Sequence, residues 1–144
     1  MNYDENNIFA KILREEIPCT KVYEDEQTLA FMDIMPQVPG HTLVIPKEPA
    51  ETLFELSDEG AANLIQKVKV VASAVKKGMN ADGITLFQLN GTGAGQTVPH
   101  IHFHVMPGSY TNATGHGKVS VSNDDIEEIA VKIRAAFKLS LIHI

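Results

Sequence analysis

The chain has 144 residues, 44% of them hydrophobic and 21% charged, a composition typical of one folded globular domain rather than a disordered chain. Twelve Lys and Arg against 18 Asp and Glu give a formal net charge of −6, which excludes the broad basic surface that nucleic acid binding requires. With one cysteine, Cys19, no signal-peptide pattern and no apolar run near the ~20 residues of a membrane span, we expect a cytoplasmic protein without disulfides that does not act at a membrane.

The first third of the chain predicts a short helix followed by an antiparallel meander. In "ENNIFAKILREEIP" (5–18) the apolar residues recur with helical spacing, and the pattern stops at Pro18. Three stretches rich in β-type residues follow, separated by a charged turn and by "MPQVPG". They are "KVYED" (21–25), "TLAFMDI" (28–34) and "HTLVIPK" (41–47).

The remainder predicts two more helices and two more strands. Ser57 is a helix N-cap, and helical periodicity continues from there to near Gly78. "GITLFQL" (83–89) and "HIHFHVM" (100–106) predict strands joined by the loop "NGTGAGQT", and "NDDIEEIAVKIRAAF" (123–137) predicts an amphipathic helix. Elements in this order indicate an α+β fold. The apolar end "LSLIHI" (139–144) fits a strand, a subunit contact or an added tail equally well.

The segment "TVPHIHFHVMP" (97–107) carries histidines at positions 100, 102 and 104. Alternate side chains of a strand point to opposite faces, so the three imidazoles share one face and the intervening apolar residues share the other. Three histidines in phase on one strand are improbable as purely structural residues. We therefore expect a functional site on the histidine face.

Spacing alone leaves two kinds of site open. Alternate histidines on a strand can bind zinc with a ligand from elsewhere, although three in succession span about 13 Å and at most two reach one ion. The preceding loop favours phosphate instead, because Gly91, Gly93 and Gly95 allow backbone N–H groups to converge on an anion. A neutral imidazole can also attack phosphorus itself, provided that its other ring nitrogen donates its proton to a fixed acceptor.

The run His100-Ile101-His102-Phe103-His104-Val105-Met106 resembles the signature of the histidine triad (HIT) family of nucleotide hydrolases and transferases. The similarity extends over "NIFAKILREEIP" (7–18), "VYEDEQTLAFMDIMPQVPGHTLVIPK" (22–47) and "NGTGAGQTVPHIHFHV" (90–105), and it is nearest to the Hint-like bacterial branch. It implies one HIT domain over 1–144, with a core at about 6–107 and an extension at 108–144. The fold implied is a mostly antiparallel sheet of about five strands with a long central helix, a short N-terminal helix and a C-terminal helix.

The resemblance also implies roles for individual residues. His102 attacks the α-phosphorus and forms a nucleotidyl-histidine that water hydrolyses, and His41 supports this nucleophile through hydrogen bonds. His100 and His104 orient the nucleophile, contact the phosphate and assist the leaving group. The implied nucleotide-binding set comprises Asp33 for the ribose hydroxyls, Asn90, Gly95, Gln96 and Thr97 for the phosphate, and Ile8, Phe9, Ile12, Phe31 and Ile34 for the walls of a purine pocket.

The sequence departs from the family pattern in two places. Many relatives carry Cys-x-x-Cys at the start of the first helix as part of a structural zinc site, whereas this chain has Asn7 and Ala10 there. We therefore predict no metal and no other cofactor. After Met106 no tryptophan-bearing C-terminus is recognisable, which leaves substrate choice open. Because family members are usually homodimers with sheets joined across the interface, we expect a homodimer.

The predicted function is hydrolysis of purine nucleoside phosphoramidates or related nucleoside monophosphate conjugates. Two alternatives stay open at this point. Hydrolysis of dinucleoside polyphosphates needs the same histidines and room for a second nucleotide. A nucleotide-binding regulatory or scaffold protein would hydrolyse nucleotides only incidentally.

Overall fold

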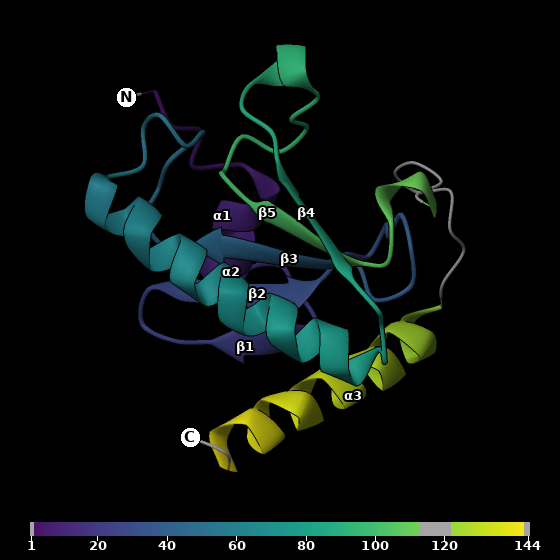
Figure 1. Ribbon diagram of the computed structural model, residues 1–144. Helices are drawn as coiled ribbons and strands as arrows, with labels where there is room; N and C mark the ends of the chain where they lie inside the picture. The colour runs from purple at the N-terminus through teal and green to yellow at the C-terminus, as the bar shows by residue number, and fades with distance from the viewer. Residues whose placement is uncertain (1, 113–121, 143–144) are drawn as a thin grey trace.

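The computed structural model describes residues 2–112 and 122–142, and its elements follow the predicted order. Five strands form one antiparallel sheet in the order β1-β2-β3-β5-β4 (Figure 1). The predicted α+β architecture and the meander of the first three strands are confirmed. The strands are β1 (Lys21–Glu24), β2 (Thr28–Met32), β3 (Thr42–Pro46), β4 (Ile84–Gln88) and β5 (Phe103–Pro107), and the α-helices are α1 (Ile8–Leu13), α2 (Asp58–Gly78) and α3 (Asn123–Ile142).

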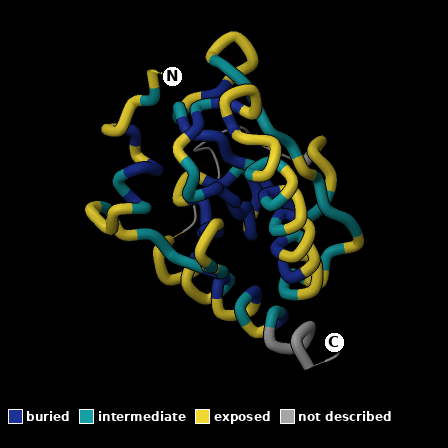
Figure 2. Tube along the Cα trace, turned by 90° about the vertical axis from the view of Figure 1, so that its left-hand side faces the viewer, coloured by how far each residue is buried: buried dark blue, intermediate teal, exposed yellow. Residues whose placement is uncertain are grey.

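The long helix α2 covers one face of the sheet, and α3 packs against it at an angle, close to the C-terminal end of α2 (Figure 1). As predicted, Ser57 is the N-cap of α2, and its side chain accepts a hydrogen bond from the Gly60 N–H at 2.9 Å. At the other end of α2, Gly78 meets α3 so closely that a Cβ there would lie 2.9 Å from Ile133 Cα. The main core forms between α2, α3 and the sheet. Figure 2 shows this buried interior enclosed by exposed helix surfaces and loops.

A second apolar cluster lies on the opposite face of the sheet, beneath α1. Strand β2 contributes to both clusters, because Ala30 and Met32 belong to the main core whereas Leu29 and Phe31 pack with Phe9 of α1. Every residue of β2 and β3 is therefore buried. The α1 face is the one that carries the site.

The histidine strand is shorter than predicted, because β5 begins at Phe103 and leaves His100 and His102 in the segment before it. The ladders that β5 forms with β3 and with β4 both stop at Phe103, which pairs with Val44 and with Gln88. Before that point the residues take other partners, and the His100 ring donates to the Pro46 carbonyl at 2.8 Å. The Ile101 N–H donates to the Ala50 carbonyl at 2.9 Å, away from the sheet ladder. The predicted alternation of faces still holds, since Ile101 is fully buried in the main core.

The helix α3 continues to Ile142, so the backbone of the apolar end is helical up to that residue and is not a strand. Residues 143–144 lie outside the described part of the chain, and so does 113–121 of the predicted extension. Within the described part, no helix combines the length and the apolar character that crossing a membrane requires.

Candidate active site

A cavity of about 380 Å³ opens between α1 and the sheet, a size in the range of small-molecule sites. It is mostly apolar, and two of its wall residues, Ile8 and Ile34, are exposed by 52% and 70% at its rim. Polar groups enter it from Asp33, Thr97 and two histidines. The residues from the predicted set that line this one cavity are Ile8, Phe9, Ile12, Phe31, Ile34, Asp33, Thr97, His102 and His104.

His102 presents one ring nitrogen as a lone-pair donor. Its Nδ1 lies 2.7 Å from the His100 carbonyl oxygen, which can only accept a hydrogen bond, so Nδ1 carries the proton. The other nitrogen, Nε2, is therefore unprotonated in the neutral ring. The edge-on ring of Phe9, with centroids 4.9 Å apart, packs against the imidazole. This is the arrangement that nucleophilic attack by an imidazole requires.

His100 lies behind the cavity and engages both of its ring nitrogens. Nε2 donates to the Pro46 carbonyl at 2.8 Å, and Nδ1 accepts from the Tyr3 hydroxyl at 2.5 Å. Burial lowers the pKa of His100 to about 4, against the opposing effect of the Pro46 carbonyl, so the ring is neutral at neutral pH. Of the roles that the resemblance implied, only orientation of His102 fits this ring, because no nitrogen turns toward the cavity.

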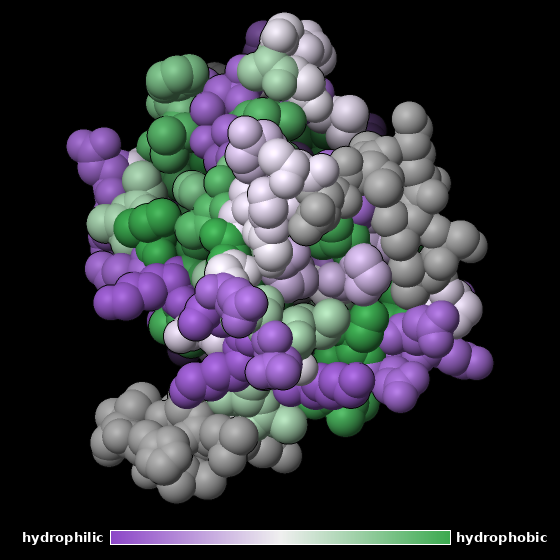
Figure 3. Space-filling view, turned by 45° about the vertical axis from the view of Figure 1, so that its right-hand side comes forward, coloured by the Kyte–Doolittle hydropathy of each residue, from purple (hydrophilic) through white to green (hydrophobic). Residues whose placement is uncertain are grey.

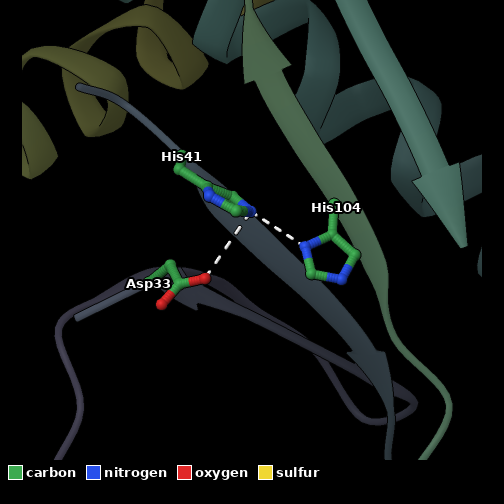
Figure 4. Close-up of side chains that lie close together, drawn as sticks. All are labelled: Asp33, His41 and His104. Atoms are coloured by element: carbon green, nitrogen blue, oxygen red, sulfur yellow. Dashed lines mark hydrogen bonds and ion pairs between the residues drawn. The ribbon is translucent and has the colours of Figure 1, made fainter. Parts of the chain in front are cut away.

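His41 connects His104 with Asp33 (Figure 4). The Gln37 backbone N–H donates to His41 Nδ1 at 3.1 Å, which places the His41 proton on Nε2. That nitrogen lies 2.9 Å from His104 Nδ1, so His104 accepts there and carries its own proton on Nε2. The ring of Phe87 stacks on His104 with centroids 4.1 Å apart. His41 and Phe87 thus fix the orientation of His104, and the tautomer of His104 follows from that of His41, which Gln37 sets.

Asp33 turns one carboxylate oxygen toward the His41 ring. Its Oδ1 accepts from the Met35 backbone N–H at 2.8 Å, whereas Oδ2 lies 3.6 Å from His41 Nε2. Among the described residues Oδ2 is buried without a hydrogen-bond partner. A buried carboxylate oxygen in this condition is costly unless a proton, a cation or a ligand donor approaches it.

These residues do not fit a metal centre. Ligand atoms of Asp33, His41 and His104 lie within 4.8 Å of one another, a donor set that suits zinc in kind. However, the Gln37 N–H forces the proton of His41 onto Nε2, which is the atom that would have to bind the ion. At the position of the relatives' Cys-x-x-Cys, Asn7 instead caps α1 by accepting from the Ala10 N–H at 2.9 Å. The absence of zinc stays a prediction.

The glycine loop differs from its prediction. Its amides at Ala94, Gly95 and Gln96 donate to carbonyls within the loop, so these three do not converge on an anion. The side chain of Gln96 is buried and closes the loop, accepting from the Gly91 N–H and donating to the Val98 carbonyl at 2.9 Å. Asn90 Oδ1 likewise accepts from the Leu53 N–H at 2.8 Å. Asn90, Gly95 and Gln96 therefore shape the loop, and Thr97, which follows it, reaches the cavity.

Two contributors to the site were missed by sequence reasoning. Tyr3 lies 97 positions before its partner His100, and no periodicity or motif connects them. The Gln37 contribution is a backbone N–H, which has no residue signature. The only signal for these two contributors was chemical. A buried neutral histidine whose N–H is hydrogen-bonded needs a donor for its other ring nitrogen.

The fold and the site together define a small α+β protein in which a fixed histidine array faces an apolar ligand cavity. The HIT domain model matches residues 14–111, and this chain belongs to the HIT family. Members of that family are generally nucleotide hydrolases.

Three relatives place the chain within the family. The adenosine 5′-monophosphoramidase of Schizosaccharomyces pombe is 38% identical over 134 residues, which cover 91% of this chain and 98% of that protein. The crystal structure of a HIT-like protein from Bartonella henselae is 48% identical with a TM-score of 0.83, covering 93% of this chain and 98% of that one. A zinc-bound histidine triad family protein from Mycobacterium smegmatis is 33% identical with a TM-score of 0.83, covering 96% and 98%.

Proposed function

We propose that this protein hydrolyses purine nucleoside phosphoramidates, or related conjugates of a nucleoside monophosphate, through a covalent intermediate on His102. The observation that carries the proposal is the hydrogen bond from His102 Nδ1–H to the His100 carbonyl, which leaves the Nε2 lone pair on a ring that lines the cavity. A relative that is 38% identical is named an adenosine 5′-monophosphoramidase, which supports a phosphorus–nitrogen bond as the one cleaved.

In the first step, His102 Nε2 attacks the α-phosphorus and forms a phosphorus–nitrogen bond. The bond to the leaving amine breaks, its electron pair stays on the amine nitrogen, and the amine takes a proton from water. A second water then attacks phosphorus and gives a proton to the hydroxide that the first water left, while the bond to Nε2 breaks and the ring regains its lone pair. The proton stays on Nδ1 and is donated to the His100 carbonyl throughout, so the positive charge of the intermediate rests on a hydrogen-bonded imidazole.

His104 contributes a hydrogen bond rather than a transferable proton. Its Nε2–H belongs to a ring that lines the cavity, where it can donate to a phosphoryl oxygen. If it gave that proton away, His41 would have to replace it through the 2.9 Å contact, and His41 would become an anion, because the Gln37 N–H occupies its other nitrogen. The hydrogen bonds from Gln37 to His41 and from His41 to His104 therefore keep the proton on His104 Nε2. His104 acts as a hydrogen-bond donor that stabilises charge on the phosphoryl group.

The nucleotide contacts follow from the lining of the cavity. The purine lies between the apolar walls of α1 and β2, where Phe9 and Phe31 meet edge to face with centroids 5.4 Å apart. The Asp33 carboxylate accepts from the ribose hydroxyls, and the Thr97 hydroxyl donates to the phosphate. Asn90, Gly95 and Gln96 act indirectly by holding the loop that ends at Thr97.

We also propose that the protein is a homodimer joined along β4. Among residues 2–112 and 122–142 this strand pairs with β5 alone, at the end of the strand order, and its Leu86 is 44% exposed. An unprotected sheet edge with apolar side chains is a surface that favours pairing with another chain. Figure 3, with the right-hand side of Figure 1 turned forward, shows patches of apolar surface between hydrophilic ones.

A panel of substrates tests the function. Turnover of adenosine 5′-phosphoramidate, its guanosine analogue and a diadenosine polyphosphate is measured for the wild type, His102→Ala and the exposed control Tyr110→Phe. We expect phosphoramidates to be the preferred substrates and only His102→Ala to be inactive. Faster turnover of the diadenosine polyphosphate would replace the proposed substrate class, and wild-type turnover by His102→Ala would refute the proposed mechanism.

A further inference from the structure

Tyr3, in the segment before α1, contacts the histidine array although it belongs to no motif. Its hydroxyl lies 2.5 Å from His100 Nδ1, and its ring meets the imidazole edge-on with centroids 5.6 Å apart. Because His100 Nε2 donates to the Pro46 carbonyl and a neutral imidazole has a single N–H, Nδ1 must accept and Tyr3 must donate. Partial burial raises the pKa of Tyr3, so the hydroxyl keeps its proton at neutral pH.

We propose that Tyr3 is a positioning residue for the nucleophile His102 and that it acts through His100. This inference rests on the proposed function. Two hydrogen bonds connect the two residues in series through His100: Tyr3 O–H to His100 Nδ1, and His102 Nδ1–H to the His100 carbonyl. A third bond, from His100 Nε2–H to the Pro46 carbonyl, anchors the ring at its other nitrogen.

The series matters because the His100 carbonyl lies outside the sheet ladder. Strand β5 begins only at Phe103, so the placement of this carbonyl depends on local bonds. These are the His100 N–H to the Val98 carbonyl and the Ile101 N–H to the Ala50 carbonyl, both 2.9 Å, together with the two bonds of the His100 ring. Loss of the Tyr3 donor leaves a fully buried Nδ1 without its partner and removes one of the few constraints on this segment.

The segment that carries Tyr3 is itself ordered by the chain around it. Asn7 Nδ2 donates to the Asp4 carbonyl at 2.7 Å, and Arg14 donates to the Glu5 carbonyl at 2.8 Å. Asn7 is also the N-cap of α1, the helix whose Phe9 contacts the His102 ring. The N-terminal segment therefore touches both histidines, one through Tyr3 and the other through α1.

The test compares Tyr3→Phe with Tyr23→Phe in the full-length protein. Tyr23 is a matched control, because its hydroxyl also makes a short hydrogen bond, 2.6 Å to Asp25, but on a strand away from the site. Nitrogen-15 spectra report the tautomers of His100 and His102 without any substrate, and steady-state kinetics with adenosine 5′-phosphoramidate report kcat and KM. Chemical unfolding shows whether both variants lose similar stability.

We expect Tyr3→Phe to lower kcat by roughly three- to tenfold with little change in KM, the loss that corresponds to one neutral hydrogen bond. We also expect it to shift the His100 Nδ1 resonance and to mix the tautomers of His102, whereas Tyr23→Phe leaves kcat and both histidines unchanged. Unaltered histidine spectra and kcat in Tyr3→Phe would overturn the inference. If the wild type does not hydrolyse phosphoramidates, the proposed function fails, while the spectra still decide whether Tyr3 controls His102.

Discussion

The buried, neutral state of His100 predicts how stability depends on pH. The His100 pKa falls from 6.5 in the unfolded chain to about 4 in the folded protein, chiefly because burial disfavours the charged ring. Between these values the unfolded state binds one proton more than the folded state, so acid favours unfolding. This residue's contribution is complete above pH 6.5 and is lost as the pH falls toward 4. At about 1.4 kcal/mol per pH unit, the loss amounts to about 3 kcal/mol.

Urea unfolding of the wild type and of His100→Gln at half-unit steps from pH 7.5 to 4 measures this effect. Glutamine keeps a donor for the Pro46 carbonyl but does not titrate, and the carboxylates titrate in both proteins and cancel in the difference. We expect the wild type to lose about 3 kcal/mol relative to the variant across this range. A difference between the two proteins that is independent of pH would refute the assignment of a buried neutral imidazole.

Three substitutions, one of them with a matched control, test the cavity, the loop and the helix packing. Ile34→Ala removes a rim residue that is 70% exposed, so we expect a higher KM for the nucleotide with a change in unfolding free energy within about 0.5 kcal/mol; an unchanged KM would place the purine elsewhere. Gly95→Ala, at φ +98°, should cost about 1–2 kcal/mol in thermal or urea unfolding, whereas Gly93→Ala points its Cβ into open space and should be neutral; equal effects would contradict the loop conformation. Gly78→Ala forces α2 away from Ile133 and should destabilise by about 1–3 kcal/mol, and a neutral result would show that the two helices pack less closely.

The elements that follow from local chemistry could be predicted from the sequence. Helix α2 begins after Ser57 and ends at Gly78 as the N-cap and the apolar period indicate, and the two faces of the histidine segment follow from alternation. The start of β5 could not be predicted locally, because it depends on where the pairing with its two neighbouring strands stops, at Val44 of β3 and Gln88 of β4. The number of residues in an alternating segment that form a strand depends on pairing with a partner strand, and that partner lies far away in the sequence.

The candidate site, too, could be predicted from the sequence only in part. The residue types and the resemblance brought the cavity walls, Asp33 and the histidines into one hypothesis. The structure places the walls, Asp33, His102 and His104 around one cavity, with His41 and His100 hydrogen-bonded to these two histidines. The division of labour among the histidines could not be predicted, because it depends on the partner of each ring nitrogen. Those partners are the carbonyl of Pro46, the backbone N–H of Gln37 and the hydroxyl of Tyr3, none of which a motif marks. The predicted cytoplasmic location and single-domain extent stay predictions.

The central claim is that His102 becomes covalently bonded to the nucleotide, and rapid quench without acid tests it most directly. The wild type and His102→Ala are mixed with adenosine phosphoramidate labelled at the α-phosphorus, quenched within the first turnover, and analysed by peptide mass spectrometry. We predict a nucleotidyl group on the wild-type peptide that contains His102, and none on the variant. Hydrolysis by the wild type without a labelled peptide, or label retained in His102→Ala, would contradict the account.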